Sequence, residues 1–186
     1  MPHADCLIIW ITGASSGIGL ALAKQFAEQN VVVILSARRE AELENVRQQL
    51  KNPNRHMVLP LDITDSAALV KATSKVIQEY GRIDYLINNA GVSQRALIFE
   101  TTEKTDRQLM EIGYFAPVNL TRCVLPFMER QGSGKVVFVS SVAGLLGTQY
   151  RASYSAAKAA IHMWANSLRA EYATKGIKVA VSFQAL

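Results

Sequence analysis

The sequence contains few of the residues that build disulfide-rich or metal-bound proteins. Its 186 residues include only two cysteines, Cys6 and Cys123, which cannot form a disulfide framework. The three histidines, His3, His56 and His162, lie far from one another, and the two cysteines are also distant from each other. No metal-ligand spacing is present, so we expect no bound metal.

Long apolar runs, blocks of like charge and repeats are also missing. The apolar runs are far too short to cross a bilayer, and no charged leader with an apolar core precedes CLIIWI. We therefore expect a cytoplasmic protein that does not enter membranes. Lysine and arginine are scattered although the net charge is +5, which argues against nucleic acid as a partner. No repeat, low-complexity tract or interdomain linker is evident.

The sequence does contain enough apolar residues for one substantial core. With 49% hydrophobic and 19% charged residues, it is expected to form a single domain over residues 1–186. Short apolar segments alternate with segments of helical spacing; the apolar ones are CLIIWIT, VVVILSA, HMVLPL, IDYLINN, KVVFVSS and IKVAVSF. This alternation is typical of a parallel sheet covered on both faces by helices. The right-handed crossover rule then favours a doubly wound α/β sheet.

The longest helical segment, residues 103–129, contains two residues that disfavour helices, Gly113 and Pro117. Proline has no N–H group, so in an α-helix the carbonyl of Gly113 would lack its hydrogen-bond donor. Glycine costs about 1 kcal/mol relative to alanine within a helix. We therefore expect a kink with a free backbone carbonyl at this point.

A glycine-rich segment, TGASSGIG, directly follows the first apolar segment and opens the first helix. Gly13, Gly17 and Gly19 would let the backbone approach a pyrophosphate closely, and the free N–H groups of the helix start would bind it. A purely structural turn is the alternative. The position after the first strand favours a dinucleotide site, because that context is the one the motif requires.

The same letters also fit G-x-S-x-G, the nucleophile elbow of serine hydrolases, over Gly13–Gly17. Such an elbow needs an earlier strand and loop to complete its oxyanion hole, and here it follows the first strand. It also needs a histidine on a late loop, whereas His162 lies within a predicted helix, residues 153–174. A serine hydrolase therefore remains a minor alternative.

The end of the second apolar segment, LSARRE, bears on the type of dinucleotide. An acidic residue there would bond the ribose 2′-hydroxyl of NAD, whereas arginine accepts the 2′-phosphate of NADP. This chain places Arg38 and Arg39 there, ahead of Glu40. A guanidinium group suits phosphate, so the pattern favours NADP over NAD. The alternative is that both arginines are only a solvated helix entry.

Groups suited to proton transfer occur in SSVAGLLGTQYRASYSAAK. Tyr154 and Lys158 are four residues apart and so share one face of a helix. An ammonium group near a phenol favours the phenolate, which suits a general acid or base. Ser141 ends a buried strand, where its hydroxyl could bond a substrate carbonyl or the phenol. Alone, such a Tyr-x-x-x-Lys pair is common on protein surfaces.

Together, TGASSGIG, LDIT, NNAG, VSSVAG and YSAAK resemble the short-chain dehydrogenases/reductases in order, spacing and context. The resemblance covers essentially all 186 residues and is strongest to the NADP-linked, hydroxysteroid-dehydrogenase-like branch. It implies a Rossmann fold and hydride transfer between a nicotinamide and a ketone or secondary alcohol. It also implies a homodimer or homotetramer that packs through the two long helices.

The resemblance further assigns roles to individual residues. Those expected to line the pyrophosphate are Gly13, Ser15, Ser16, Ile18 and Gly19. Arg38 and Arg39 are expected to meet the 2′-phosphate, and Asp62 and Ile63 are expected to flank the adenine. The residues expected to border the ribose and nicotinamide side are Asn89, Ala90 and Gly91. The expected catalytic residues are Ser141, which would orient the carbonyl, Tyr154, which would transfer the proton, and Lys158, which would bind the ribose and tune Tyr154.

Two departures from the family pattern bear on activity. Gly113 stands where the family has an asparagine whose carbonyl holds a water linking Lys158 to solvent, so Gly113→Asn is expected to raise turnover. The sequence also ends at QAL, before the family's Pro-Gly turn, substrate-covering segment and last strand. A non-catalytic NADP-binding or dimerising protein, with a sheet lacking its last strand, is therefore the main alternative.

Overall fold

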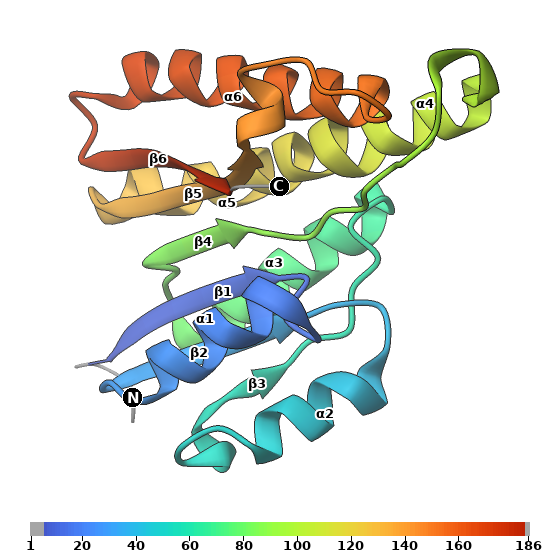
Figure 1. Ribbon diagram of the computed structural model, residues 1–186. Coiled ribbons are helices and arrows are strands. Elements are labelled where there is room, and N and C mark those ends of the chain that lie inside the picture. The colour runs from blue at the N-terminus through green and yellow to red at the C-terminus, as the bar shows by residue number, and fades with distance from the viewer. Residues whose placement is uncertain (1–5, 185–186) are drawn as a thin grey trace.

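Six parallel strands form a single sheet in the computed structural model, which describes residues 6–184 (Figure 1). The strands are β1 (Leu7–Thr12), β2 (Val31–Ser36), β3 (Met57–Val58), β4 (Tyr85–Asn88), β5 (Gly134–Ser141) and β6 (Ile177–Gln184). Their spatial order is β3-β2-β1-β4-β5-β6. This arrangement confirms the predicted doubly wound α/β sheet of the Rossmann type.

Helices pack on both faces of the sheet, because successive strand residues point to opposite sides. The helices are α1 (Gly17–Ala27), α2 (Glu40–Gln48), α3 (Ser66–Tyr80), α4 (Glu103–Met110), α5 (Ala116–Gln131) and α6 (Ala152–Tyr172). One core joins Ile8 and Trp10 of β1 to α3, α5 and α6, and the other joins Ile9 and Ile11 to α1 and α2. None of the helices in residues 6–184 is long and apolar enough to cross a membrane.

The sheet face that carries α1 and α2 is less completely covered at β6 than we expected. Along β6, Ile177 and Val179 are buried, whereas Lys178 and Ala180 are exposed. Lys178 pairs in register with Lys135 of β5, so two charged side chains share this face. The expectation of two covered faces therefore holds for the centre of the sheet and is wrong for β6, where buried and exposed residues alternate over its first half.

The predicted long helix at residues 103–129 is interrupted at the expected place. A π-helical turn, Glu111–Phe115, separates α4 from α5, and the N–H of Ala116 donates to the carbonyl of Glu111 five residues earlier. Pro117 follows at the start of α5, where its missing N–H is tolerated. The predicted free carbonyl of Gly113 stays a prediction.

Candidate functional site

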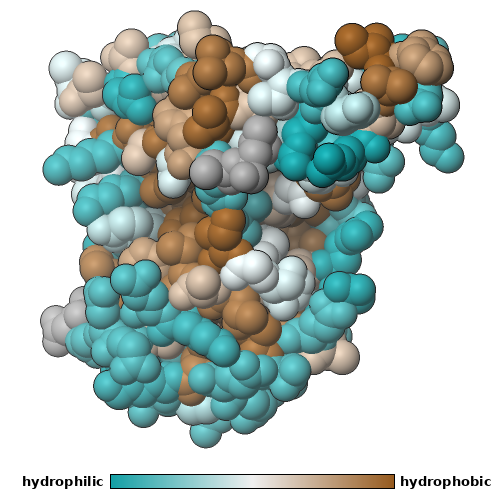
Figure 2. All heavy atoms as spheres, viewed as in Figure 1, coloured by the Kyte–Doolittle hydropathy of each residue, from teal (hydrophilic) through white to brown (hydrophobic). Residues whose placement is uncertain are grey.

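A cavity of about 660 Å³ lies where β1, β2, β4 and β5 end at their carboxyl sides. This is where doubly wound sheets bind ligands. The predicted site residues that line it are Gly13, Ser15, Ser16, Ile18, Arg38, Arg39, Asp62, Ile63, Asn89, Ala90, Gly91, Tyr154 and Lys158. Gly19 and Ser141 are the two predicted residues outside the lining. Figure 2 shows the molecule hollowed between its upper and lower parts.

The loop between β1 and α1 requires glycine at two positions. Gly13 has φ +65°, and a Cβ there would lie 2.8 Å from the Cα of Ala90. A Cβ on Gly19 would lie 2.2 Å from the carbonyl oxygen of Gly13. Gly19 therefore lets α1 pack under the loop, which explains why it is buried rather than exposed to the cavity.

The start of α1 leaves backbone donors available for an anion. Ser16 is the N-cap residue, but its side chain makes no capping hydrogen bond, and the first turn contains no acidic residue. Helix-start N–H groups and the helix dipole together favour a phosphate. The loop therefore fits the pyrophosphate of a dinucleotide.

Thr12, which the sequence analysis did not single out, ties this loop to the end of β4. Its buried hydroxyl accepts hydrogen bonds from the N–H groups of Asn89 (3.0 Å) and Ala90 (3.1 Å), and it donates to the carbonyl of Ile87 (3.3 Å). The Asn89 amide in turn donates to the carbonyls of Thr12 (3.0 Å) and Gly13 (3.2 Å). The signal in the sequence was a polar residue ending an otherwise apolar strand.

The two arginines after β2 differ in their surroundings. Arg39 pairs with Glu42 at 2.6 Å and is 73% exposed, whereas Arg38 forms no ion pair within the described residues. The pKa of Asp62 is lowered, first by hydrogen bonds from the backbone and hydroxyl of Thr64 and to a smaller extent by the charge of Arg38. Arg38 is thus the freer of the two cations to meet a phosphate.

Tyr154 and Lys158 lie on successive turns of α6 and both face the cavity. The Nζ of Lys158 is 5.8 Å from the centroid of the Tyr154 ring and donates to the carbonyl of Val139 at 2.8 Å. Because Lys158 is buried, its pKa is lowered to about 8. The pair therefore combines a phenol with an ammonium group that can lose its proton near neutral pH.

The hydroxyl of Ser141 is engaged within the protein. It accepts from the N–H of Ala143 (3.2 Å) and donates to the carbonyl of Gln184 (3.4 Å), and the residue is buried. Its neighbour Ser140 lines the cavity instead, while donating to the carbonyl of Lys158 (3.3 Å). The proposed role of Ser141 in orienting a carbonyl stays a prediction, because that role needs this hydroxyl to be released.

Gly113 contacts the helix that carries the tyrosine–lysine pair. A Cβ at position 113 would lie 2.9 Å from the Cβ of Ala157, which is closer than two such atoms normally approach. Gly113→Asn would therefore push the π-helical turn away from α6 beside Lys158. The expected gain in turnover from this substitution stays a prediction, and the asparagine would also have to overcome this steric contact.

Several cavity residues were missed from the sequence, although Leu61 and Thr64 lie within LDIT and Val139 and Ser140 lie within VSSVAG. The additional polar ones are Thr64, Ser93, Gln108, Glu111, Ser140 and Gln184, and the apolar ones are Ala37, Leu61, Val92, Ile112 and Val139. They come from the ends of β2, β5 and β6, from the segments that follow β3 and β4, and from the end of α4 and the π-helical turn. Only the fold brings these places together.

Taken together, the structure is a doubly wound α/β sheet whose glycine loop, two arginines and tyrosine–lysine pair line one cavity. A family model described as "short chain dehydrogenase" matches residues 7–183. The chain belongs to the short-chain dehydrogenase/reductase family.

Curated relatives and solved structures agree with this assignment. Dehydrogenase/reductase SDR family member 7 of Homo sapiens is 45% identical over 173 residues, covering 90% of this chain and 51% of the relative. Dehydrogenase/reductase SDR family protein 7-like of Drosophila melanogaster is 42% identical over 177 residues, covering 92% of this chain and 54% of the relative. The chain thus spans about half the length of the curated relatives it matches.

Two solved structures superimpose closely. A short-chain dehydrogenase from Streptomyces avermitilis has a TM-score of 0.91 and 39% identity, covering 95% of this chain and 64% of that one. A gluconate 5-dehydrogenase from Burkholderia cenocepacia, in complex with NADP and tartrate, has a TM-score of 0.91 and 26% identity. The match covers 97% of this chain and 71% of that one. These relatives lend no support to the predicted hydroxysteroid-dehydrogenase-like branch.

Burial of Lys158 predicts a specific dependence of stability on pH. With a folded-state pKa of about 8 against 10.5 in the unfolded chain, the unfolded state binds more protons between these values. The free energy of unfolding should therefore rise with pH across this window, by roughly 3 kcal/mol at most. Urea unfolding of the wild type and of Lys158→Met, from pH 7.5 to 10.5 in steps of about half a pH unit, measures this rise in the free energy of unfolding.

The Lys158→Met variant should lack this rise, whereas Lys71→Met, which removes an exposed lysine of α3, should keep it. Parallel curves for the wild type and Lys158→Met would show that Lys158 keeps an ordinary pKa in the folded protein.

Proposed function

We propose that this protein is an NADP(H)-dependent oxidoreductase that interconverts a ketone and a secondary alcohol. The observation that carries the proposal is the single cavity that joins the glycine loop, Arg38 and the Tyr154–Lys158 pair. A dinucleotide would then extend along the carboxyl ends of the strands, with its phosphates at α1 and its nicotinamide near α6.

The residues around the glycine loop would hold NADP. The loop and the first turn of α1 would bind the pyrophosphate, Arg38 the 2′-phosphate, and Asp62 and Ile63 would flank the adenine. Asn89 would border the nicotinamide side while keeping its hydrogen bonds to the loop. When bound, the nicotinamide would supply or accept the hydride.

Tyr154 would donate a proton to the developing alkoxide during reduction, and would accept it during oxidation. Lys158 would lie beside the phenol, and its lowered pKa of about 8 suits it to replace the proton from solvent. Its bond to the Val139 carbonyl fixes the ammonium group on the cavity wall. These two side chains would supply the proton chemistry of the reaction.

The preference for NADP rests on two observations. The gluconate 5-dehydrogenase and a metagenomic short-chain oxidoreductase that this chain resembles were solved in complex with NADP, the second at a TM-score of 0.90 and 26% identity. Arg38 lies at the end of β2 in the cavity without a carboxylate partner among the described residues.

A non-catalytic NADP-binding protein is the second candidate. Gly113 in place of the expected asparagine and the internal hydrogen bonds of the Ser141 hydroxyl favour it. The serine hydrolase alternative loses support, because His162 bonds Asn166 (3.1 Å), packs against Phe183 and does not line the cavity that Ser15 faces. Homo-oligomerisation through α5 and α6 and a cytoplasmic location stay predictions.

Removing the Arg38 guanidinium should change the choice of nucleotide. Arg38→Gln is expected to weaken NADPH binding about tenfold or more and to leave NADH binding nearly unchanged, because only NADPH carries the 2′-phosphate. Titration of each nucleotide, followed by its fluorescence, measures both affinities. Arg39→Gln is the matched control and should lose less of the affinity for NADPH, since Arg39 is already paired with Glu42. Equal losses for the two nucleotides would place the 2′-phosphate elsewhere.

Turnover separates the two candidate functions. The wild type is expected to oxidise NADPH in the presence of a panel of ketones. Tyr154→Phe, which keeps the ring and removes the hydroxyl that carries the proton, should abolish this oxidation. Tyr172→Phe, at the far end of α6, should retain activity. NADPH binding without turnover on any ketone would favour the non-catalytic candidate.

A further inference from the structure

A second cation lies beside the proposed proton donor. Arg151 directly precedes α6, and its guanidinium carbon is 5.8 Å from the centroid of the Tyr154 ring. Lys158 lies at the same distance from that ring. The tyrosine therefore lies close to two positive charges, one of which, Lys158, already has a part in the proposed proton transfer.

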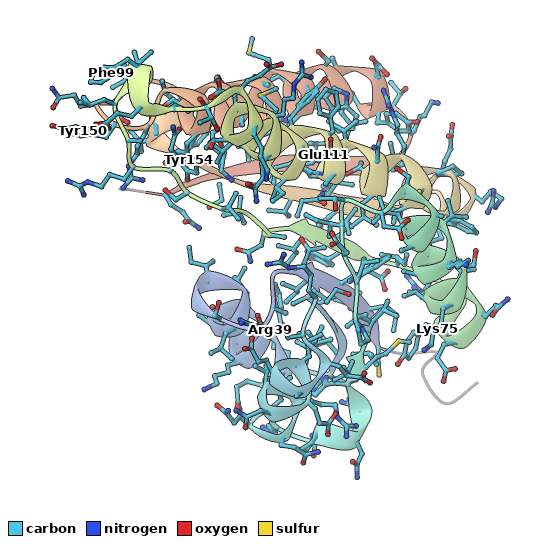
Figure 3. The ribbon with its side chains drawn as sticks, turned by 90° about the vertical axis from the view of Figure 1, so that its right-hand side faces the viewer. Arg39, Lys75, Phe99, Glu111, Tyr150 and Tyr154 are labelled. Carbon is cyan, nitrogen blue, oxygen red and sulfur yellow. The ribbon has the colours of Figure 1, made fainter. Side chains whose placement is uncertain are left out.

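The turn before α6 holds Arg151 in place. Tyr150 has φ +65°, a left-handed conformation that bulky residues rarely adopt. Its carbonyl accepts a hydrogen bond from the N–H of Ala96 (3.0 Å), and the guanidinium of Arg95 lies 5.8 Å from its ring. Such a conformation persists only where the surrounding structure enforces it, which is common at ligand sites. Figure 3 shows Tyr150 and Tyr154 at the same end of the molecule.

Most of the hydrogen-bonding capacity of Arg151 is unused within the part of the chain described. One nitrogen donates to the Ser93 hydroxyl at 3.4 Å; Ser93 and Tyr154 line the cavity, and Arg151 lies beside them without being part of the lining. A guanidinium group has five N–H donors. Two carboxylates line the cavity, Asp62 and Glu111, and neither forms an ion pair with Arg151. A half-buried arginine with free donors fits a carboxylate from outside the protein.

Arg151 and Arg38 follow strands that are not neighbours in the sheet. Arg38 follows β2 and Ser141 precedes the turn that leads to Arg151, and β1 and β4 lie between β2 and β5. Three strand spacings separate the two ends by about 14 Å. In Figure 3, Arg39 lies well apart from Tyr150 and Tyr154. The 2′-phosphate expected at Arg38 is therefore not the anion that Arg151 would meet.

We propose that Arg151 binds a carboxylate group of the substrate, so that the preferred substrates are short oxo-acids or the corresponding hydroxy-acids. This inference rests on the proposed oxidoreductase function, because it names the substrate class of the same site. The carboxylate would pair with the Arg151 guanidinium while the carbonyl faces the Tyr154 hydroxyl. Arg151 is thus a specificity residue that orients the substrate.

The test compares an oxo-acid with its uncharged ester. Binding of 4-oxopentanoate and of its methyl ester is measured by calorimetry at pH 7, on the whole chain alone and saturated with NADP⁺. The wild type should bind the acid at least about tenfold more tightly than the ester, since a charge-assisted bidentate pair is lost in the ester. In Arg151→Gln this preference should disappear. Arg122→Gln, which removes an exposed arginine of α5, should keep it.

Each outcome separates the inference from the function on which it rests. Failure of NADP⁺ to bind would remove the proposed function, whereas the acid–ester comparison on the chain alone would still test Arg151. Equal affinities of the wild type for acid and ester, or an unchanged preference in Arg151→Gln, would overturn the inference. If Arg151→Gln does not fold, Arg151→Lys replaces it and should show a smaller preference than the wild type, because lysine keeps the charge without the planar fork.

Discussion

The site depends on the hydrogen bonds that join Thr12, at the end of β1, to Asn89 and Ala90, at the end of β4. One buried hydroxyl accepts from two backbone N–H groups, and the Asn89 amide returns two bonds to the glycine loop. Loop backbone is otherwise free to move, so these bonds determine where the pyrophosphate site lies. The close approach of Gly13 to Ala90 follows from the same contact, and it excludes any side chain at Gly13.

The other end of the cavity is organised by α6. Its first two turns present Tyr154 and Lys158, and the bond from Lys158 to Val139 ties the helix to β5. Gly113 lets the π-helical turn approach Ala157 closely. This turn therefore also helps to position the pair on α6. The family model matches residues 7–183, and these contacts fit the dinucleotide site and the proton-transfer pair that we propose.

Much of the fold and most of the lining could be predicted from the sequence, because they follow from local patterns. Apolar runs between amphipathic helices gave the sheet, and the glycine loop, Arg38 and Tyr154–Lys158 lie in the cavity as expected. The polar edge at β6, the internal bonds of Ser141 and the contact of Gly113 with Ala157 could not be predicted. They depend on distances between segments far apart in the chain, which no spacing within one segment encodes. Arg151 was missed for the same reason, whereas Thr12 did carry a local signal, a polar residue that ends an otherwise apolar strand.

The most direct test of this account is the affinity for NADPH of Thr12→Val, measured by nucleotide fluorescence beside Thr73→Val. Both variants remove a buried hydroxyl at nearly constant volume, but the hydroxyl of Thr73 bonds only the Leu69 carbonyl within α3. The account predicts that Thr12→Val stays folded and binds NADPH about tenfold or more weakly, because two backbone donors lose their acceptor and the loop shifts, while Thr73→Val binds as the wild type does. Wild-type affinity in a folded Thr12→Val protein would contradict it.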